Sequence, residues 1–333
     1  MDKFKKKLQE YADINGLNIL SAYKNGNFYV GILSDGTRIM ETLSNKEIRF
    51  VPDFAMNCDV KITNRCDANC KYCHEGSNYM GKDGDLNLPI FDTWREGTEM
   101  AIGGGNALCH PDLVPFLQRM KARNVICNIT INQKHILSYW SLIQRLIIEE
   151  LVHGIGISLT DSSNTEDMKL IDMLCEQNKN NVVIHVINGI LTEKDLPALK
   201  NKKVLILGYK DNVGRGISYY KENEEDINKN MKWLQDNLRK IYDDLQVVSF
   251  DNLAIQQLNV KEVFGLSDEQ WDSMYQGDDY GDLNGKYYPT TFYFDAVNKM
   301  VGRSSTQIQV DRIPYSNQSF DECFKLSLKC LEK

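Results

Sequence analysis

The sequence predicts an α/β fold: a partial (β/α)6 barrel of the TIM type, with a small N-terminal α/β-meander cap and a C-terminal hairpin-helix extension. Between residues 57 and 250, six near-continuous apolar runs alternate with helical patterns, which is typical of a parallel sheet covered by helices. The 333 residues are 42% hydrophobic and 26% charged, an ordinary globular composition that can form such a core. We expect three parts: residues 1–56, 57–250 and 251–333.

The first part, residues 1–56, has the pattern of one helix followed by a small β-meander. The helix is expected near residues 2–14. Three short strand-like runs follow, separated by the turn signals KNGN and SDGT. These runs are NILSAY, NFYVGIL and TRIMETL. The part would either cap the core or contact substrate.

The second part, residues 57–250, contains the six strand-then-helix units. The expected strands are CDVKI, AIGGG, VICNITI, HGIGISL, NVVIHVI and KVLIL. The helices expected after them span 90–100, 111–123, 134–151, 165–178, 192–200 and 224–245. The count favours a full or partial barrel over a doubly wound sheet. In such barrels functional groups gather on the loops that follow the strands.

The third part, residues 251–333, continues the segment VVSFDNLAIQQL and runs through a loop rich in Gly and Asp. It then contains an expected hairpin over 290–306, with the turn signal VNKM, and a last helix over 319–333. Two cysteines, Cys323 and Cys330, lie on that last helix. We expect this part to form a C-terminal cap.

Composition and charge exclude several classes of function. The net charge of -7 and the pI near 5.4 argue against sequence-independent binding of a large nucleic acid. No apolar run approaches ~18 residues, so no transmembrane helix and no membrane partner are expected. The N-terminus lacks the apolar region of a signal peptide, which predicts a cytoplasmic protein. Nine cysteines, an odd number, are then not expected to form a disulfide framework.

Three cysteines, Cys66, Cys70 and Cys73, lie in the loop after the first expected core strand, with the spacing C-x3-C-x2-C. A redox pair needs only C-x-x-C and leaves Cys66 without a role. A structural zinc site takes four ligands and commonly has a second cysteine pair. The candidates for its fourth ligand are His74, Cys58 and Cys109. Three thiolates suit a [4Fe–4S] cluster whose fourth iron is open to an exogenous ligand.

Around these cysteines the chain resembles the radical S-adenosylmethionine (SAM) superfamily. The signature of that superfamily is C-x3-C-x2-C with an aromatic residue before the third cysteine, and CDANCKYC matches it with Tyr72. The resemblance covers roughly residues 57–250 and is most specific at this motif. It implies an enzyme in which the three cysteines hold one [4Fe–4S] cluster and SAM binds the open iron.

A second matching segment is AIGGGNALCHPDL, one strand-helix unit after the cysteines. Gly103, Gly104 and Gly105 have no Cβ atoms, so their backbone can approach a ligand closely. The resemblance implies that this backbone holds the amino group of SAM. The superfamily often has a glutamate next, whereas this chain has Asn106, a neutral residue that still offers a carbonyl acceptor.

Three later strand ends resemble the superfamily more loosely. At the fourth strand, the resemblance implies that Ser158 and Thr160 meet the SAM ribose, although capping of the strand end would explain them equally well. At the fifth strand it nominates Asn188. At the sixth strand it implies that backbone near Leu207 and Gly208 faces the adenine.

The charged residues and histidines of these loops have simpler explanations. Lys210 and Arg215 would meet a substrate carboxylate or phosphate, or would be ordinary solvated loop charges. His185 lies in an apolar strand, and we interpret it as a core histidine whose hydrogen bonds are satisfied. His74 and Glu75 directly follow the cysteines, where hydrogen bonding around the cluster is plausible.

The resemblance implies a reaction as well as a site. SAM would be cleaved reductively to a 5′-deoxyadenosyl radical, which abstracts hydrogen from a substrate. The C-terminal hairpin and helix resemble the extension in which many peptide-modifying members bind auxiliary clusters, and this resemblance favours a peptide or amino-acid-like substrate. Ser304 and Ser305 stand where a cysteine of that extension would be expected, and Cys323 and Cys330 alone cannot saturate a second cluster, so a single cluster is expected. An electron donor such as flavodoxin or ferredoxin would be a partner. The alternatives are a nucleotide or small-metabolite substrate, group transfer from SAM, and a zinc-stabilised binding module without catalysis. No catalytic residue is nominated.

Overall fold

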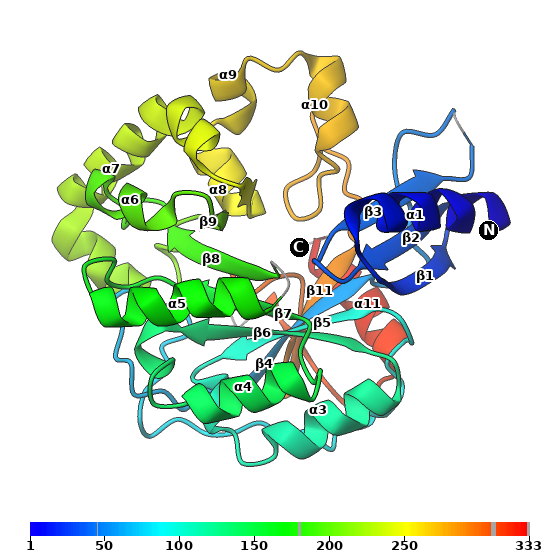
Figure 1. Ribbon diagram of the computed structural model, residues 1–333, viewed down its shortest axis with the longest axis horizontal. Coiled ribbons are helices and arrows are strands. Elements are labelled where there is room, and N and C mark those ends of the chain that lie inside the picture. Colours follow the sequence, from blue (N-terminus) through cyan, green and yellow to red (C-terminus); the bar gives the residue numbers. More distant parts are fainter. Residues whose placement is uncertain (45, 179–180, 308–310, 332–333) are drawn as a thin grey trace.

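The computed structural model describes residues 1–44, 46–178, 181–307 and 311–331 (Figure 1). It contains a large sheet and a small one. The strands of the large sheet are β4 (Asn57–Thr63), β5 (Glu99–Gly104), β6 (Ile126–Asn132), β7 (Gly154–Ser158), β8 (Val182–Ile187), β9 (Lys203–Leu207), β10 (Val247–Phe250), β11 (Thr291–Asp295), β12 (Met300–Gly302) and β13 (Ile313–Pro314). Their order is β10-β9-β8-β7-β6-β5-β4-β11-β12-β13.

The six expected core strands are confirmed as β4 to β9, and they pair in parallel in chain order. Parallel neighbours need crossover connections, and these contain the helices of the core. They are α2 (Pro89–Asp92), α3 (Leu113–Ala122), α4 (Trp140–Ile148), α5 (Thr165–Gln177) and α6 (Leu196–Leu199), with the 3-10 turns η1 (Ala107–Cys109), η2 (Gln133–His135) and η3 (Glu193–Asp195). The order runs from β10 to β13 without closing, so the partial α/β barrel is confirmed.

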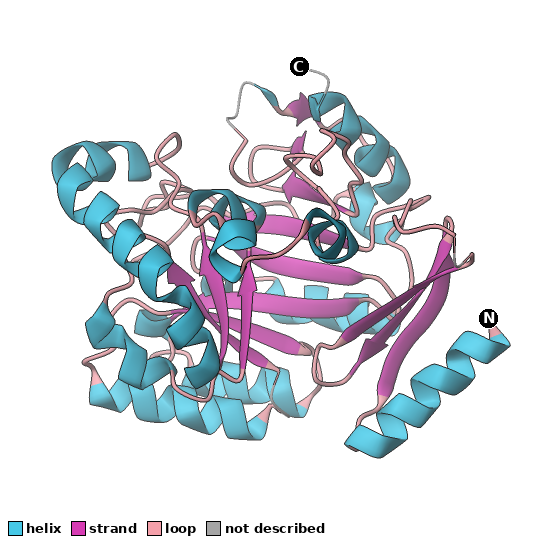
Figure 2. Cartoon of the chain, turned by 90° about the horizontal axis from the view of Figure 1, so that it is seen from above, coloured by secondary structure: helices cyan, strands magenta, loops and turns pink. Residues whose placement is uncertain are grey.

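Helices α3, α4 and α5 cover one face of this sheet (Figures 1 and 2). In β6 to β9 the side chains alternate between fully buried and partly buried positions, as expected for strands with two different faces. The fully buried set, with Ile129, Ile157, Ile184 and Ile206 as examples, belongs to the main hydrophobic core beneath the helices. The other face is left free to form a site.

Two expected helices are wrong in extent. The helix expected over 90–100 is a single turn, α2, because the backbone leaves the helical region at Thr93, with φ of -106° and ψ of 7°. Gly97, with φ of 76°, then leads into β5 at Glu99. The helix expected over 134–151 is divided into η2 and α4. In η2 the Asn132 side chain accepts a hydrogen bond from the Lys134 N–H, which caps a turn that periodicity does not indicate.

The long helix α7 (Gly216–Asp244) follows β9 and starts before the expected position at Glu224. Its backbone is non-helical at Asn223, so two helices are joined there across a kink. Three shorter helices come after β10. They are α8 (Asn252–Gln257), α9 (Val260–Phe264) and α10 (Asp268–Met274).

The N-terminal helix and meander form as expected. They are α1 (Asp2–Asn15), β1 (Ile19–Asn25), β2 (Phe28–Leu33) and β3 (Arg38–Thr42). Phe4, Leu8 and Ala12 recur along one helix face and are buried against the sheet. The meander contacts the N-terminal ends of the core strands: Arg38 forms an ion pair with Glu99 of β5, and Lys203 of β9 donates to the Asp35 carbonyl at 3.1 Å.

The expected C-terminal hairpin is confirmed as β11 and β12, and the last helix as α11 (Phe320–Leu328), followed by η5 (Lys329–Leu331). Residues 332 and 333 of that expected helix lie outside the described residues. β11 also pairs in parallel with β4, so the hairpin extends the core sheet. Phe320 and Cys323 of α11 are buried in the main core. The hairpin thereby brings C-terminal side chains beside the cysteine loop.

Among the helices that the structure describes, none is both long and apolar enough to cross a lipid bilayer.

Candidate functional site

The cysteine loop, residues 64–78, follows β4 and is held mainly by backbone hydrogen bonds. The Cys66 N–H donates to the Asn78 carbonyl at 2.9 Å, and the Asn78 N–H donates to the Asn64 carbonyl at 3.1 Å, so the two ends of the loop lie together. Asn69 takes a left-handed backbone with φ of 48° between the first two cysteines. The turn at Asn69 thus separates Cys66 from Cys70 in a segment that is neither helix nor strand.

All nine cysteines of the chain are free, and Cys66, Cys70 and Cys73 are half-buried. Burial raises the pKa of the Cys66 and Cys70 thiols, and neighbouring cysteine thiols of the loop raise both further. Lys134 and Arg215 oppose the rise at Cys70. Thiols with raised pKa values lose their protons when a metal binds, and nearby cations offset the negative charge that results. The donor set itself, three free and partly buried thiols on one loop, is the one that an iron–sulfur cluster takes.

Arg215, at the start of α7, fastens the cysteine loop. Its Nε donates to the Cys70 carbonyl at 2.9 Å, its Nη1 to the Ser77 carbonyl at 2.8 Å, and its backbone N–H to the Cys73 carbonyl at 2.9 Å. A Cβ on Gly214, which has φ of 57°, would lie 2.2 Å from the His74 carbonyl oxygen. The sequence left open whether Arg215 was a solvated charge, and the structure shows it engaged with the loop backbone.

Tyr72 lies on the same side of the loop as Arg215 and α7. Its ring contacts the ring of Tyr219 edge-on, with centroids 5.7 Å apart. Burial raises the pKa of the Tyr72 phenol, so the hydroxyl stays protonated at neutral pH. The aromatic position of the motif thus packs the loop against α7.

The three glycines after β5 differ in their surroundings. A Cβ on Gly104, which has φ of 111°, would lie 2.5 Å from the Thr63 carbonyl oxygen, and one on Gly105 would lie 2.4 Å from that of Arg65. A Cβ on Gly103 would meet nothing within 4 Å. Gly104 and Gly105 therefore allow close packing against the start of the cysteine loop, while Gly103 leaves open space.

Asn106 is buried, and its side-chain oxygen accepts a hydrogen bond from the Leu108 N–H at 3.2 Å. Its backbone N–H donates to the Arg65 carbonyl at 2.8 Å. Asn106 therefore caps the turn η1 through its side chain and ties that turn to the cysteine loop through its backbone N–H. It does not line the cavity described next.

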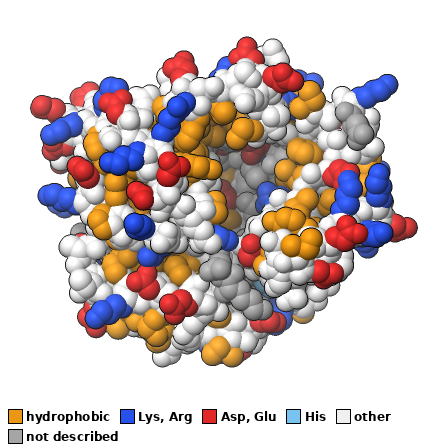
Figure 3. All heavy atoms as spheres, turned by 45° about the horizontal axis from the view of Figure 1, so that its top comes forward, with side chains coloured by type: hydrophobic (Ala, Val, Ile, Leu, Met, Phe, Trp, Pro, Cys, Tyr) orange, Lys and Arg blue, Asp and Glu red, His pale blue; other side chains and the backbone are white. Residues whose placement is uncertain are grey.

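A cavity of about 560 Å³ lies against the face of the sheet that the helices leave free. Figure 3 shows the molecule hollowed in the middle of one face, with hydrophobic side chains around the rim. The predicted site residues that line the cavity are Gly103, Gly104, Ser158 and Leu207. The cavity-facing positions of β7 are Gly154, Gly156 and Ser158, whose small side chains make room there.

The other late-strand residues do not line the cavity. Thr160 donates from its backbone N–H to Gln133 Oε1 at 2.9 Å, which is strand-end capping. Asn188 is fully buried: its Nδ2 donates to Gln257 Oε1 at 3.1 Å, while its Oδ1 has no hydrogen-bond partner. A Cβ on Gly208 would lie 2.4 Å from the Leu253 Cγ.

His185 lines the cavity, so its interpretation as a core histidine is wrong. It occupies a cavity-facing position of β8 and leans across Gly156, where a Cβ would lie 2.6 Å from its Nε2. Burial lowers the pKa of His185 to about 4, which keeps the ring neutral at pH 7. The strand period of two could have placed it on the face of Ser158 and Thr130, because residues of paired strands share faces.

Four charged residues form an inner charge cluster at the end of the cavity next to the cysteine loop: Lys61, Glu75, Asp295 and Arg312. Lys61 Nζ lies 2.6 Å from Glu75 Oε2 and 3.5 Å from Asp295 Oδ2, and Arg312 Nη1 lies 3.6 Å from the same Asp295 oxygen. Burial opposes ionisation of Glu75, yet contact with His74 and Lys61 holds its pKa well below the usual range. Ion pairs between residues far apart in the sequence leave no local pattern, so the sequence analysis did not predict this cluster.

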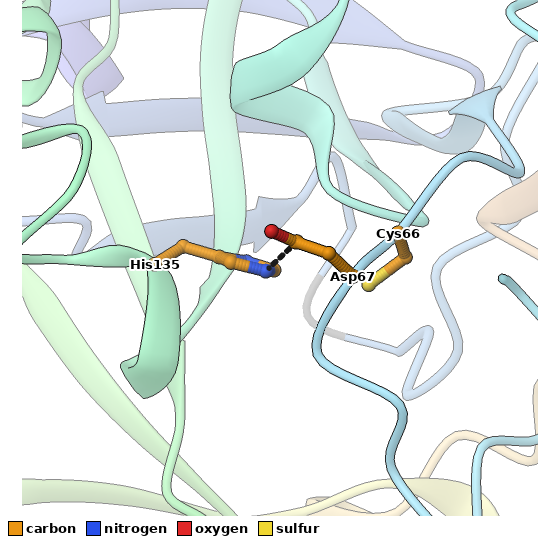
Figure 4. A group of neighbouring side chains, drawn as sticks. All are labelled: Cys66, Asp67 and His135. Carbon is orange, nitrogen blue, oxygen red and sulfur yellow. Dashed lines mark hydrogen bonds and ion pairs between the residues drawn. The ribbon is translucent and has the colours of Figure 1, made fainter. Parts of the chain in front are cut away.

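A second possible metal site shares one of the cysteines. The ligand atoms of Cys66, Asp67 and His135 lie within 4.8 Å of one another (Figure 4). His135 Nε2 is 2.8 Å from Asp67 Oδ1, and its buried Nδ1 has no hydrogen-bond partner. Three ligands of this kind suit zinc, which takes nitrogen, sulfur and carboxylate oxygen.

Neither a protein-family model nor a curated protein sequence matches this chain. Solved structures of Streptococcus suis SuiB do match it. SuiB bound to its precursor peptide SuiA aligns with a TM-score of 0.56 at 12% identity, over 84% of this chain and 65% of SuiB. SuiB bound to S-adenosylmethionine aligns with a TM-score of 0.50 at 12% identity, over 82% of this chain and 64% of SuiB. The likeness shows the fold. The chain thus spans less than two thirds of SuiB.

Proposed function

We propose that this chain is a radical SAM enzyme that acts on a peptide. The observation that carries the proposal is the position of three free thiols, Cys66, Cys70 and Cys73, on the loop after β4. The first residues of that loop pack against the glycines after β5, and its later residues His74 and Glu75 line the cavity. In parallel α/β folds, sites form at the carboxyl ends of the strands. The SuiB fold, which is found with SAM bound, supports the same assignment.

The three cysteines would hold one [4Fe–4S] cluster, and the open iron would bind SAM through its amino and carboxylate groups. When bound, the cluster would supply one electron that cleaves SAM to methionine and a 5′-deoxyadenosyl radical. The backbone of Gly103 to Gly105 would orient the SAM amino group. Ser158 and Leu207, at neighbouring strand ends of the cavity wall, would face the ribose and adenine.

The rest of the cavity would hold the substrate and exclude water from the radical. Residues of the N-terminal part, such as Ile32 and Leu33, line it together with Tyr293 and Ser305 of the C-terminal part. We propose that residues 1–56 and 251–333 enclose the substrate on the 57–250 core. A peptide substrate is supported by the precursor peptide bound to SuiB, a protein of the same fold.

The test is anaerobic reconstitution with iron and sulfide, followed by iron analysis and measurement of 5′-deoxyadenosine after reduction with dithionite. The unmodified chain should bind about four irons and form 5′-deoxyadenosine, and Cys70→Ala should lose both. Formation of S-adenosylhomocysteine alone would contradict the radical reaction. Cys175→Ala, which removes a thiol of α5, is the matched control and should change neither result.

The Cys66–Asp67–His135 group favours a second candidate, a zinc site. The same variants distinguish it, because zinc bound there would survive Cys70→Ala but be lost in His135→Ala. If the chain binds no iron, and binds zinc that is retained in Cys70→Ala and lost in His135→Ala, the assignment as a radical SAM enzyme is wrong.

A further inference from the structure

Lys210, in the loop that follows β9, points its ammonium group into the cavity. Its Nζ donates to Ser305 Oγ at 3.0 Å, and both residues line the cavity wall. Among the described residues, no carboxylate oxygen lies within the 4.0 Å of an ion pair with this nitrogen. An ammonium group has three donors, so two are left for another acceptor.

The carboxylates that influence Lys210 most are engaged elsewhere. Burial lowers the pKa of Lys210, and Asp251 and Glu75 oppose this. Asp251 Oδ1 accepts the N–H groups of Gly208 at 2.9 Å and Ala254 at 2.7 Å. Glu75 accepts from Lys61 and from the Tyr293 hydroxyl. Lys210 is therefore a partly desolvated cation without a close counter-ion, which is costly unless a ligand supplies one.

Charge balance at this end of the cavity favours an anionic ligand of low charge. The inner charge cluster has two cations, Lys61 and Arg312, against Glu75 and Asp295, so its charges cancel. Lys210 adds one positive charge beside it, and Asp59, a carboxyl that lines the same cavity and has no ion pair among the described residues, offsets that charge in part. A monoanion can pair with Lys210, whereas a phosphate dianion would exceed that single charge and would be repelled by Glu75, Asp295 and Asp59.

We propose that Lys210 and Ser305 bind a carboxylate of the substrate, such as the side chain of a glutamate or aspartate in a peptide. Two free donors of Nζ and the Ser305 hydroxyl would point at its oxygens, giving charge-assisted hydrogen bonds. This subsite lines the same cavity as Leu207 and Ser158, so it would hold the substrate in the cavity that also takes SAM. The inference rests on the proposed function for the identity of the occupant.

The test compares two isosteric probes, N-acetyl-glutamate α-amide and N-acetyl-glutamine α-amide, by calorimetric titration into the full chain. The glutamate probe should bind at least about tenfold more tightly than the glutamine probe, the factor expected for hydrogen bonds to a charged group. Lys210→Met should bring the ratio near one, and Lys210→Arg should keep a clear preference. Lys221→Met, which removes an exposed charge of α7, is the matched control and should leave the ratio unchanged.

Several outcomes would overturn the proposal: equal binding of both probes by the unmodified chain, a preference that persists in Lys210→Met, or tighter binding of inorganic phosphate. A weaker SAM affinity in Lys210→Met, with the probe ratio unchanged, would assign Lys210 to SAM instead. If Lys210→Met does not fold, Ser305→Ala replaces it and should lower the ratio about threefold. Probe binding needs no iron, so failure of the cluster assignment and failure of this subsite are observed separately.

Discussion

The cysteine loop and the inner charge cluster lie next to each other but are held in different ways. The loop is fixed by backbone hydrogen bonds, by glycines that let backbones approach, and by Arg215 bound to two of its carbonyl groups. The inner charge cluster is fixed by ion pairs between β4, the loop, β11 and the segment after it. The loop should therefore tolerate many side-chain changes, whereas the cluster should be sensitive to removal of a single charge.

The largest effect on stability is expected from Lys61→Met. Lys61 is 4% exposed and bonds to two carboxylates, so its loss leaves buried negative charge without compensation. Removing one partner of a buried pair typically costs about 3–5 kcal/mol. Chemical denaturation of the apoprotein at pH 7 should show a loss of this size. Lys5→Met, on the exposed face of α1, should cost less than about 0.5 kcal/mol.

A double variant tests whether charge pairing is the cause. In Lys61→Met/Glu75→Gln the main pair is removed together, so the combined loss should be smaller than the sum of the two single losses. Strictly additive losses would mean that the two charges are not coupled. The inner charge cluster would then not be held by ion pairs, and the proposed difference between it and the cysteine loop would be wrong.

A smaller and more local effect is expected from Arg215→Gln. The variant loses two charge-assisted hydrogen bonds to the loop, and the loop backbone should open more often while global stability changes little. Amide hydrogen exchange in residues 66–77 should accelerate about tenfold, corresponding to about 1.4 kcal/mol. Arg145→Gln, which removes a surface pair with Glu149 on α4, is the control. Equal exchange in the loop of both variants would exclude a positioning role for Arg215.

The difference between local and long-range contacts also explains which parts of the structure could be predicted from the sequence. The six core strands, the meander and the hairpin follow from local periodicity and turn residues, and they were predicted. The cysteine motif and the glycines are also local, so their proximity could be inferred from parallel strand order. Gly103, Gly104, Ser158 and Leu207 were in this way correctly brought to one face of the sheet.

Contacts between segments far apart in the sequence could not be predicted in the same way. Nothing local in TTFYFD indicates that β11 pairs with β4, and that pairing brings Asp295 to Lys61 and Ser305 near Lys210. His185 was misplaced because its apolar neighbours suggested a core position, although every second residue of the strand faces the cavity. The end of the cavity at the inner charge cluster is built largely from such long-range contacts. The sequence therefore predicted a cofactor from local motifs and left the substrate open.

The smallest predicted effect concerns Asp59, a cavity-lining residue of β4 whose carboxylate has a weak contact with Asn57 at 3.5 Å. Burial raises the pKa of Asp59 to about 6, above its value in the unfolded chain, so the folded state binds this proton more tightly. The group therefore favours folding below about pH 4 and loses that contribution as the pH rises through about 6. Because the carboxylate faces the open cavity, solvent reduces the effect to about 1 kcal/mol or less.

Asp59→Asn should consequently stabilise the chain at pH 7.5 and leave its stability unchanged at pH 4, as measured by urea denaturation at both values. Asp2→Asn, on the exposed start of α1, is the control and should show no such dependence in the same window. Equal stabilisation by Asp59→Asn at both pH values would mean that a neutral packing effect, and not the ionisation of this carboxyl, is responsible. A stabilisation that grows between pH 5 and 7 would show that ionised Asp59, which unlike the residues of the inner charge cluster forms no direct ion pair among the described residues, costs stability when the chain folds.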